Sequence, residues 1–241
     1  VESWEHWALV AHPSEGDFLY RNGVLESGCS AETDDDPFAA EIMGISGGVV
    51  VGSRWDLDTD TDKHFFNAVI DEFFFAPRFL SEDAVRALAG QVPSPVPTIS
   101  IAPTTVESSA EVLMYFENSL QNNGTGTDIS DIVATGMTYS GTIVEQGAYS
   151  ADFNGHDNYL EFDIGDTDQD TYTFAFWCYF RGYGQRLERA YIVDNRVSAD
   201  DGFAWFVDTL ATGDPDNTAP EFTGIQAGDG MINCTFAPAV E

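Results

Sequence analysis

The sequence has few positively charged residues. It contains 41 Asp and Glu against 9 Lys and Arg, a formal net charge of -32, and Lys63 is the only lysine. Nucleic acid is not an expected partner, because binding to phosphates depends on Lys and Arg. The acidic residues are spread along the whole chain rather than gathered in a tail. This composition favours a halophilic protein, in which salt screens the self-repulsion; a calcium-rich extracellular setting is the alternative.

Cysteine is scarce as well, and long apolar runs are absent. Three cysteines are too few for a disulfide scaffold. Cys178 lies within FAFWCYF and is expected to be a buried small hydrophobic residue, whereas Cys29 and Cys234 either pair or remain free. No apolar run reaches the length of about 20 residues that a membrane-spanning helix needs, and no signal peptide is recognisable, so membrane insertion is not expected. The chain starts at Val1, which suggests a processed product or a fragment.

The chain does contain enough apolar surface for a core. Hydrophobic residues make up 43% of its 241 residues and aromatic residues 13%, which suits one large β domain or two small ones. Residues 91–110 are the clearest break in composition, because they are rich in proline and read as an extended, semi-stiff linker. This linker separates two strand-rich segments, residues 1–90 and 111–241.

Residues 65–90 read as a strand, a turn and a short helix. The strand runs through FFNAVIDEFFF and is apolar on most of both faces, so we expect it to be covered on both sides. Simple alternation places Ile70 and Glu72 on the same face. A proline breaks the strand, Ser81 is a good N-cap for the helix, and Gly90 closes it.

Strand patterns also occur elsewhere on both sides of the linker. Before it, WEHWALVA predicts a strand, and Asn22-Gly23 predicts a hairpin between two apolar runs. After it, strands are predicted in EVLMYFE, in YSADFNGHDNYLEFDIG and in YTFAFWCYF. The chain therefore reads as an all-β protein with one short helix.

These segments resemble the laminin-G-like (concanavalin A-like) jelly-roll family. The strand, turn and helix of residues 65–90, and the Trp-x-His-Trp strand with its Asn-Gly hairpin, are similar to the second half of that domain. The segment after the linker is similar to the first half. The residues that carry this second match are Phe116, Glu117, Phe153, Asn154, Gly155, Tyr159, Leu160, Phe174, Phe176 and Trp177. The resemblance implies an antiparallel two-sheet jelly-roll sandwich assembled in permuted order, with its C-terminal half in residues 1–90 and its N-terminal half in residues 111–241.

The two halves are expected to meet, because half a sandwich would expose an apolar face and open strand edges. They meet either within one chain, as a circular permutant, or between neighbouring copies in a fibre. The proline-rich linker favours assembly across copies. In both cases residues 70–75 should lie beside residues 111–116, and residues 234–236 close to residues 4–10.

The resemblance also implies a calcium ion near the first and last strands of the family's domain. Carried over by motif, its acidic ligands are Glu117 and Asp71, and Asn118, Asn122 and Asn123 add carbonyl oxygens. Oxygen ligands of this kind suit a hard cation that takes six to eight of them. The alternative is that these acids are only polar residues at strand edges.

One acidic strand invites an enzymatic interpretation. Glu161-Phe-Asp163-Ile-Gly-Asp166 resembles the acidic strand of jelly-roll glucanases, in which acids at alternate positions face a cleft. Alternation puts Glu161 and Asp163 on one face, but glycine occupies the third position of that face and Asp166 points away. We therefore expect no enzymatic activity.

The expected function is that of a non-catalytic structural and adhesive module in an extracellular, cell-surface or virion-surface fibre. Its partners would be copies of itself, neighbouring domains of a longer chain, or a glycan, with calcium as the stabilising ion. Trp55 and Trp205 are candidate glycan contacts, although core packing is the competing interpretation. The alternative function is a glycan-cleaving enzyme on the same fold.

Overall fold

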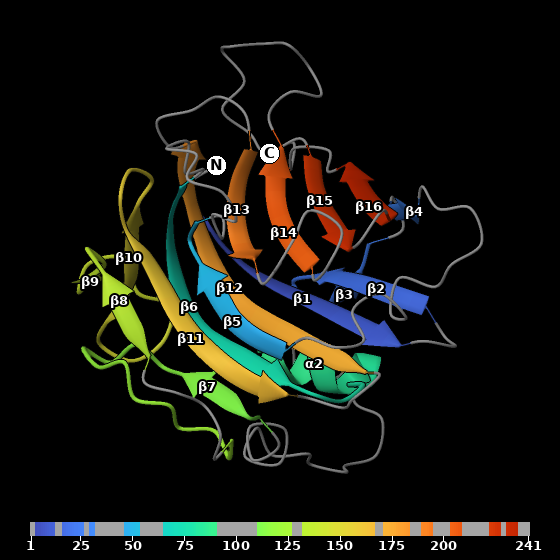
Figure 1. Ribbon diagram of the computed structural model, residues 1–241, viewed down its shortest axis with the longest axis horizontal. Coiled ribbons are helices and arrows are strands. Elements are labelled where there is room, and N and C mark those ends of the chain that lie inside the picture. Colours follow the sequence, from blue (N-terminus) through green and yellow to red (C-terminus); the bar gives the residue numbers. More distant parts are fainter. Residues whose placement is uncertain are drawn as a thin grey trace.

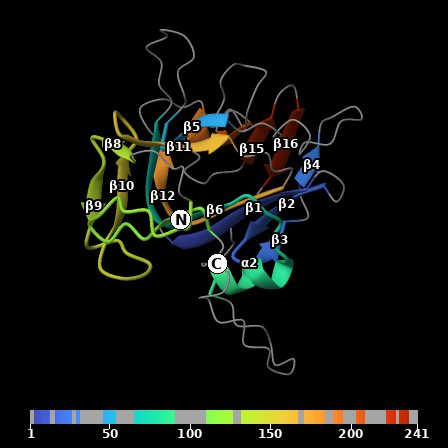
Figure 2. The same ribbon diagram turned by 60° about the horizontal axis from the view of Figure 1, so that its bottom comes forward.

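The described residues form an all-β sandwich of two antiparallel sheets, with one short helix on the outside of the sandwich (Figures 1 and 2). The computed structural model describes residues 3–12, 16–26, 29–31, 46–53, 65–90, 110–126, 132–166, 171–183, 189–194, 203–208, 222–227 and 230–235. Within these ranges, no helix is both long enough and apolar enough to cross a membrane.

Sheet A contains eight strands, and its central members are the longest. Its order is β3 (Val24–Leu25), β2 (Gly16–Arg21), β1 (Trp4–His12), β12 (Tyr172–Tyr183), β6 (Phe66–Ala76), β10 (Ser150–Asn154) and β9 (Thr138–Ser140), with β7 (Val112–Met114) also paired to β6. Strands β7 and β10 share one edge of β6, because β7 pairs with its C-terminal part and β10 with its N-terminal part.

Sheet B faces sheet A across the core. Its order is β4 (Cys29–Ala31), β16 (Gly230–Thr235), β15 (Phe222–Ala227), β14 (Phe203–Asp208), β13 (Arg189–Asp194), β5 (Ser46–Val51), β11 (Tyr159–Asp166) and β8 (Val133–Thr135). The short strand β4 is therefore one edge of this sheet.

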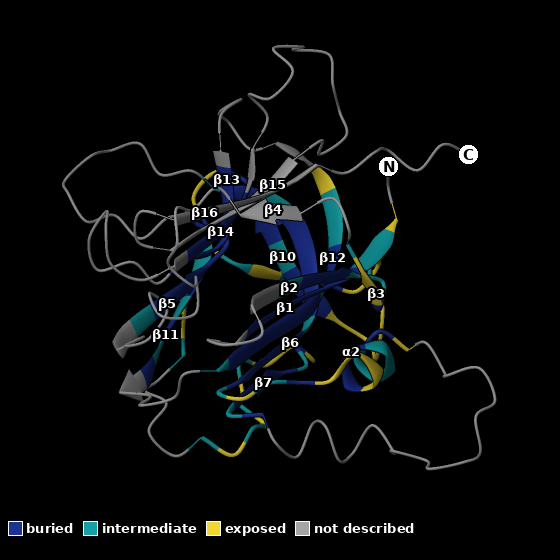
Figure 3. Cartoon of the chain, turned by 90° about the vertical axis from the view of Figure 1, so that its right-hand side faces the viewer, coloured by how far each residue is buried: buried dark blue, intermediate teal, exposed yellow. Residues whose placement is uncertain are grey.

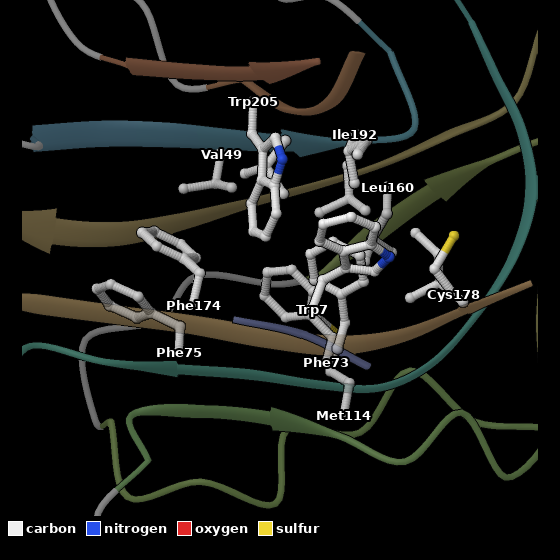
Figure 4. Close-up of a cluster of buried hydrophobic side chains, with 14 of the residues drawn as sticks. Trp7, Val49, Phe73, Phe75, Met114, Leu160, Phe174, Cys178, Ile192 and Trp205 are labelled. Carbon is white, nitrogen blue, oxygen red and sulfur yellow. The ribbon is translucent and has the colours of Figure 1, made fainter. Parts of the chain in front are cut away.

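Aromatic and branched side chains from both sheets fill the space between them. Figure 4 shows Trp205, Val49 and Ile192 of sheet B directed toward Trp7 and Phe73 of sheet A. The Trp205 ring centroid lies 5.0 Å from that of Phe176 and 6.5 Å from that of Trp7, and these contacts suit aromatic packing. Figure 3 shows the buried middle of sheet A and the buried parts of β5, β13 and β14 in sheet B.

Strand β6 is covered on both faces, as its apolar sequence predicts. Phe73 and Phe75 point into the core, whereas Phe74 packs under the helix α2 (Glu82–Leu88) on the outer face of sheet A. The strand contains a β-bulge, because its register with β12 shifts between the Asp71 and Phe74 pairs. The prediction of uninterrupted alternation through Ile70 and Glu72 is therefore wrong.

The helix begins and ends where the sequence predicts. The Ser81 hydroxyl accepts the N–H of Ala84 at 3.4 Å, and Gly90 has a φ of +65° just beyond the C-cap. Ala84 and Val85 are buried against sheet A, so α2 covers a second, smaller apolar cluster.

The segments before and after the linker contribute strands to both sheets. The predicted neighbourhood of residues 70–75 and 111–116 is confirmed, since Phe73, Phe74 and Phe75 pair with Met114, Leu113 and Val112. Strand β16 pairs with β15 and β4 in sheet B, whereas β1 belongs to sheet A, so these two strands are not paired. The closeness of residues 234–236 to residues 4–10 remains a prediction, and residue 236 lies outside the described residues. In this structure the two segments pair within one chain. Their jelly-roll topology, their permuted origin and assembly across copies remain predictions.

Candidate functional site

Asp71 is a buried carboxyl at the bulge of β6. It has no exposed surface, and its Oδ1 accepts the N–H of Glu72 at 3.0 Å. Its Oδ2 accepts the N–H groups of Glu145 and Gln146, at 3.2 and 3.1 Å. Burial raises the pKa of Asp71 to about 6 against the effect of these three N–H bonds, and the nearby charge of Glu117 raises it further.

Glu117 follows β7 and lies against the same loop as Asp71. Both of its carboxylate oxygens are 3.0 Å from the N–H of Ala148. A Cβ atom built on the neighbouring Gly147 would lie 1.4 Å from Glu117 Oε1, so only glycine leaves room for this approach. Residues 141–149 connect β9 to β10 and are called the β9–β10 loop; together with Asp71 and Glu117 they form the acidic corner.

Backbone strain is concentrated at the acidic corner. Among the described residues, four that are not glycine have positive φ, and three of them adjoin the two acids: Glu72 at +50°, Phe116 at +54° and Asn118 at +52°. Each such conformation costs about 1–3 kcal/mol and persists only where the surrounding structure enforces it. Gln146 adds one restraint, because its Nε2 donates to Glu72 Oε2 at 2.8 Å.

Of the three asparagines predicted as calcium ligands, Asn122 uses its side chain to bond backbone groups beside β7. The Asn122 side-chain oxygen accepts the N–H groups of Leu113 at 2.9 Å and Gly124 at 2.8 Å, and its amide donates to the carbonyl of Glu111. Asn122 thus satisfies the free edge of β7. The roles of Asn118, Asn122 and Asn123 as calcium ligands remain predictions.

The donor set at the acidic corner meets only part of what calcium requires. Two carboxylates converge there, but the described part of the chain holds no group of three or more His, Cys, Asp or Glu side chains arranged for a metal ion. A calcium ion would complete its shell of six to eight oxygens with backbone carbonyls and water. The carboxylates of Asp71 and Glu117 would be its protein ligands.

Of the two tryptophans predicted as glycan contacts, the structure describes only Trp205. Trp205 is fully buried in the core, so its prediction as a surface contact is wrong. Trp55 lies outside the described residues.

The acidic strand β11 presents its acids on the outer face of sheet B. Leu160 and Phe162 fill the core, so the intervening Glu161 and Asp163 face outward. Through Val50 of β5, the register aligns Glu161 with Asp194 of β13. Sequence reasoning missed Asp194, because its place on this face depends on the pairing of three strands that are distant in sequence.

His6 lies on the opposite side of the molecule, on the outer face of sheet A. It lines a small cavity beneath α2 together with Glu72 and Trp177. Burial lowers the pKa of His6 to about 3, and its Nδ1 has no hydrogen-bond partner among the described residues. The imidazole is therefore neutral at neutral pH and packs edge-on against Trp177, as expected for a structural histidine.

Comparisons of the chain with protein-family models, with curated proteins and with solved structures give no match.

Proposed function

We propose that the chain is a non-catalytic structural and adhesive module of the laminin-G-like jelly-roll type, displayed on an extracellular, cellular or virion surface and stabilised by calcium. The observation that supports this proposal is the convergence of Asp71 and Glu117 on one loop. The two acids come from separate segments of the chain, and the bulge and the strained residues around them fix the loop that covers them.

Electrostatics gives calcium a role at this corner. Glu117 raises the pKa of Asp71, so the two carboxylates repel each other in a chain that already carries a net charge of -32. A divalent cation between them would replace this repulsion with attraction and would favour the ionised form of Asp71. Its contribution would be structural, since it would fasten the β9–β10 loop to β6 and to the end of β7.

Calorimetric titration of chelator-treated protein with calcium tests the proposal. We expect saturable binding by the wild type, a rise in its thermal midpoint, and affinity at least about tenfold lower in Glu117→Gln, since one carboxylate ligand is lost. Glu26→Gln is the matched control, because this acid lies beyond β3 at the far edge of sheet A. Absence of calcium binding in the wild type, or equal affinity in Glu117→Gln, would refute the calcium site.

Glycan binding is tested separately. A glycan array probed with the whole chain at neutral pH, with and without calcium, distinguishes an adhesive module from an architectural one. Retention of specific glycans, weakened by Trp55→Ala, supports adhesion through that residue. An array with no retained glycan restricts the proposal to the architectural role.

The outer face of sheet B supports the alternative of a glycan-cleaving enzyme. Glu161 and Asp163 are two residues apart on one strand, about 7 Å along it. Asp194, two strands away at about 10 Å, has no exposed surface. Carboxyl pairs of glycosidases are about 5–5.5 Å apart in retaining enzymes and about 6.5–9.5 Å apart in inverting ones. Release of reducing ends from a β-glucan that is lost in Glu161→Gln would establish this activity and overturn the non-catalytic proposal.

A further inference from the structure

The backbone register pairs two of the three cysteines directly across neighbouring strands at the edge of sheet B. Cys29 of β4 is paired directly with Cys234 of β16, next to the pairs Ser30–Asn233 and Ala31–Ile232. Residues directly opposite each other in an antiparallel pair have Cα atoms about 4.5–5.5 Å apart. Disulfide-bonded cysteines have Cα separations of about 4.4–6.8 Å, so the backbone at this position suits a disulfide bond.

The third cysteine does not compete for either partner. Cys178 lies in β12 of sheet A, within the core, and is buried. Burial raises the pKa of its thiol far above the ordinary value, which leaves almost no reactive thiolate. Of the three pairings that three cysteines allow, the fold favours only Cys29 with Cys234.

We propose that Cys29 and Cys234 form an intrachain disulfide that fastens the edge strand β4 to β16. The oxidant is a small-molecule disulfide of the oxidised glutathione class. The thiolate of one cysteine attacks a sulfur of that disulfide, forms a mixed disulfide and expels one thiolate. The thiolate of the second cysteine then attacks the mixed disulfide, forms the Cys29–Cys234 bond and expels the other thiolate. Two protein thiols lose two electrons and two protons, and the oxidant gains them as two thiols.

This bond joins the two sides of the linker. Cys29 precedes residues 91–110 and Cys234 follows them, so the disulfide ties the segment of residues 1–90 covalently to the segment of residues 111–241. As an intrachain bond it joins the two segments within one copy, and the proposal does not depend on the proposed function.

Tryptic mapping under non-reducing conditions tests the proposal, because cleavage after Lys and Arg separates the three cysteines. They fall in the peptides of residues 22–54, 87–181 and 197–241. After equilibration of the folded protein with oxidised glutathione, we expect residues 22–54 linked to 197–241 with the loss of two hydrogens, and separate peptides after reduction. A linked peptide that contains Cys178, or no linked peptide, overturns the assignment.

Counting free thiols in denaturant provides a second test, in which the wild type is compared with two cysteine variants. With three cysteines in the chain, we expect one free thiol in the wild type, two in Cys29→Ser and none in Cys178→Ser. If a variant fails to fold, the tryptic map of the wild type still tests the proposed disulfide. Reduction should lower the thermal midpoint of the wild type by about 5–15 °C and leave that of Cys29→Ser unchanged.

Mixing ¹⁵N-labelled and unlabelled protein before oxidation separates the two modes of linkage. Linked peptides in which both partners carry the same isotope support an intrachain bond. Hybrid peptides, together with covalent dimers on a non-reducing gel, would show linkage across copies and overturn the intrachain assignment.

Discussion

Gly147 allows the β9–β10 loop to lie directly on the Glu117 carboxylate. Its φ is +72°, and a side chain there would displace Glu117 from the N–H of Ala148. The acidic corner therefore depends on a glycine as much as on its two acids.

Substitution of Gly147 by alanine should destabilise the fold by about 2–3 kcal/mol, from the strained φ together with the lost contact of Glu117. Gly90→Ala is the matched control, because Gly90 also has a positive φ but no atom lies within 4 Å of the added Cβ. We expect Gly90→Ala to cost only about 1 kcal/mol, measured by urea unfolding. Equal losses in the two variants would show that the contact with Glu117 contributes nothing.

Asp71 should make stability depend on pH in an unusual direction for a carboxyl. Its folded pKa is raised to about 6 from 3.8, so between these values the native state binds a proton more tightly than the unfolded state does. The contribution of protonated Asp71 to the free energy of unfolding is about 2–3 kcal/mol. It is fully present below about pH 4 and is lost as the pH rises through about 6. Urea unfolding from pH 4 to 7 should show this decline in the wild type and a flatter profile in Asp71→Asn. Parallel profiles would contradict the raised pKa.

At the scale of single elements, local patterns predicted strands and helix ends well. The strand of β6, the proline break, the Ser81 cap and Gly90 were all predictable, because each depends on neighbours in sequence. The bulge in β6 was not predictable, because it appears only in the register with β12. The same applies to the acidic corner: the motif indicated Asp71 and Glu117, but the β9–β10 loop that covers them comes from a hairpin about 30 residues beyond Glu117.

Helix α2 offers a test of local capping. Ser81→Ala removes the acceptor for the Ala84 N–H and should destabilise the protein by about 0.5–1 kcal/mol. Ser81→Asp is the control, since Asp is an equally good N-cap and suits the positive end of the helix dipole. A thermal midpoint of Ser81→Asp below that of Ser81→Ala would contradict the role of Ser81 as an N-cap.

At the scale of the whole molecule, the net charge of -32 opposes compaction. Some arginines are used in ion pairs, such as Arg21 with Glu5 and Arg181 with Asp152, and these leave most of the acidic charge uncompensated. Added salt screens such repulsion between exposed charges.

The thermal midpoint should therefore rise as KCl or NaCl is increased into the molar range. Differential scanning calorimetry from 0.05 to 3 M salt measures this; the Debye length falls from over 10 Å to below about 3 Å over this range. Sucrose at matched osmolality is the control for general exclusion of solutes. A midpoint that stays flat across the salt series would exclude the halophilic interpretation.

The interleaving of strands predicts that neither side of the linker folds alone. Both sheets take strands from before residue 90 and after residue 110, so each fragment would expose half a core. Peptides of residues 1–90 and 110–241 should each lack a cooperative transition by circular dichroism and should regain it when mixed. Cooperative unfolding of either fragment by itself would contradict a single shared core.

The central position of β6 also affects how the protein is made. The ribosome releases β6 about 100 residues before it completes β12, which is the main partner of β6. At a synthesis rate of about 5–20 residues per second, the strand waits about 5–20 s without that partner. During this interval its three consecutive phenylalanines form an unpaired, aggregation-prone segment. The yield of folded protein should then depend on translation speed and on chaperones that bind nascent chains, more than on the stability of the finished sandwich.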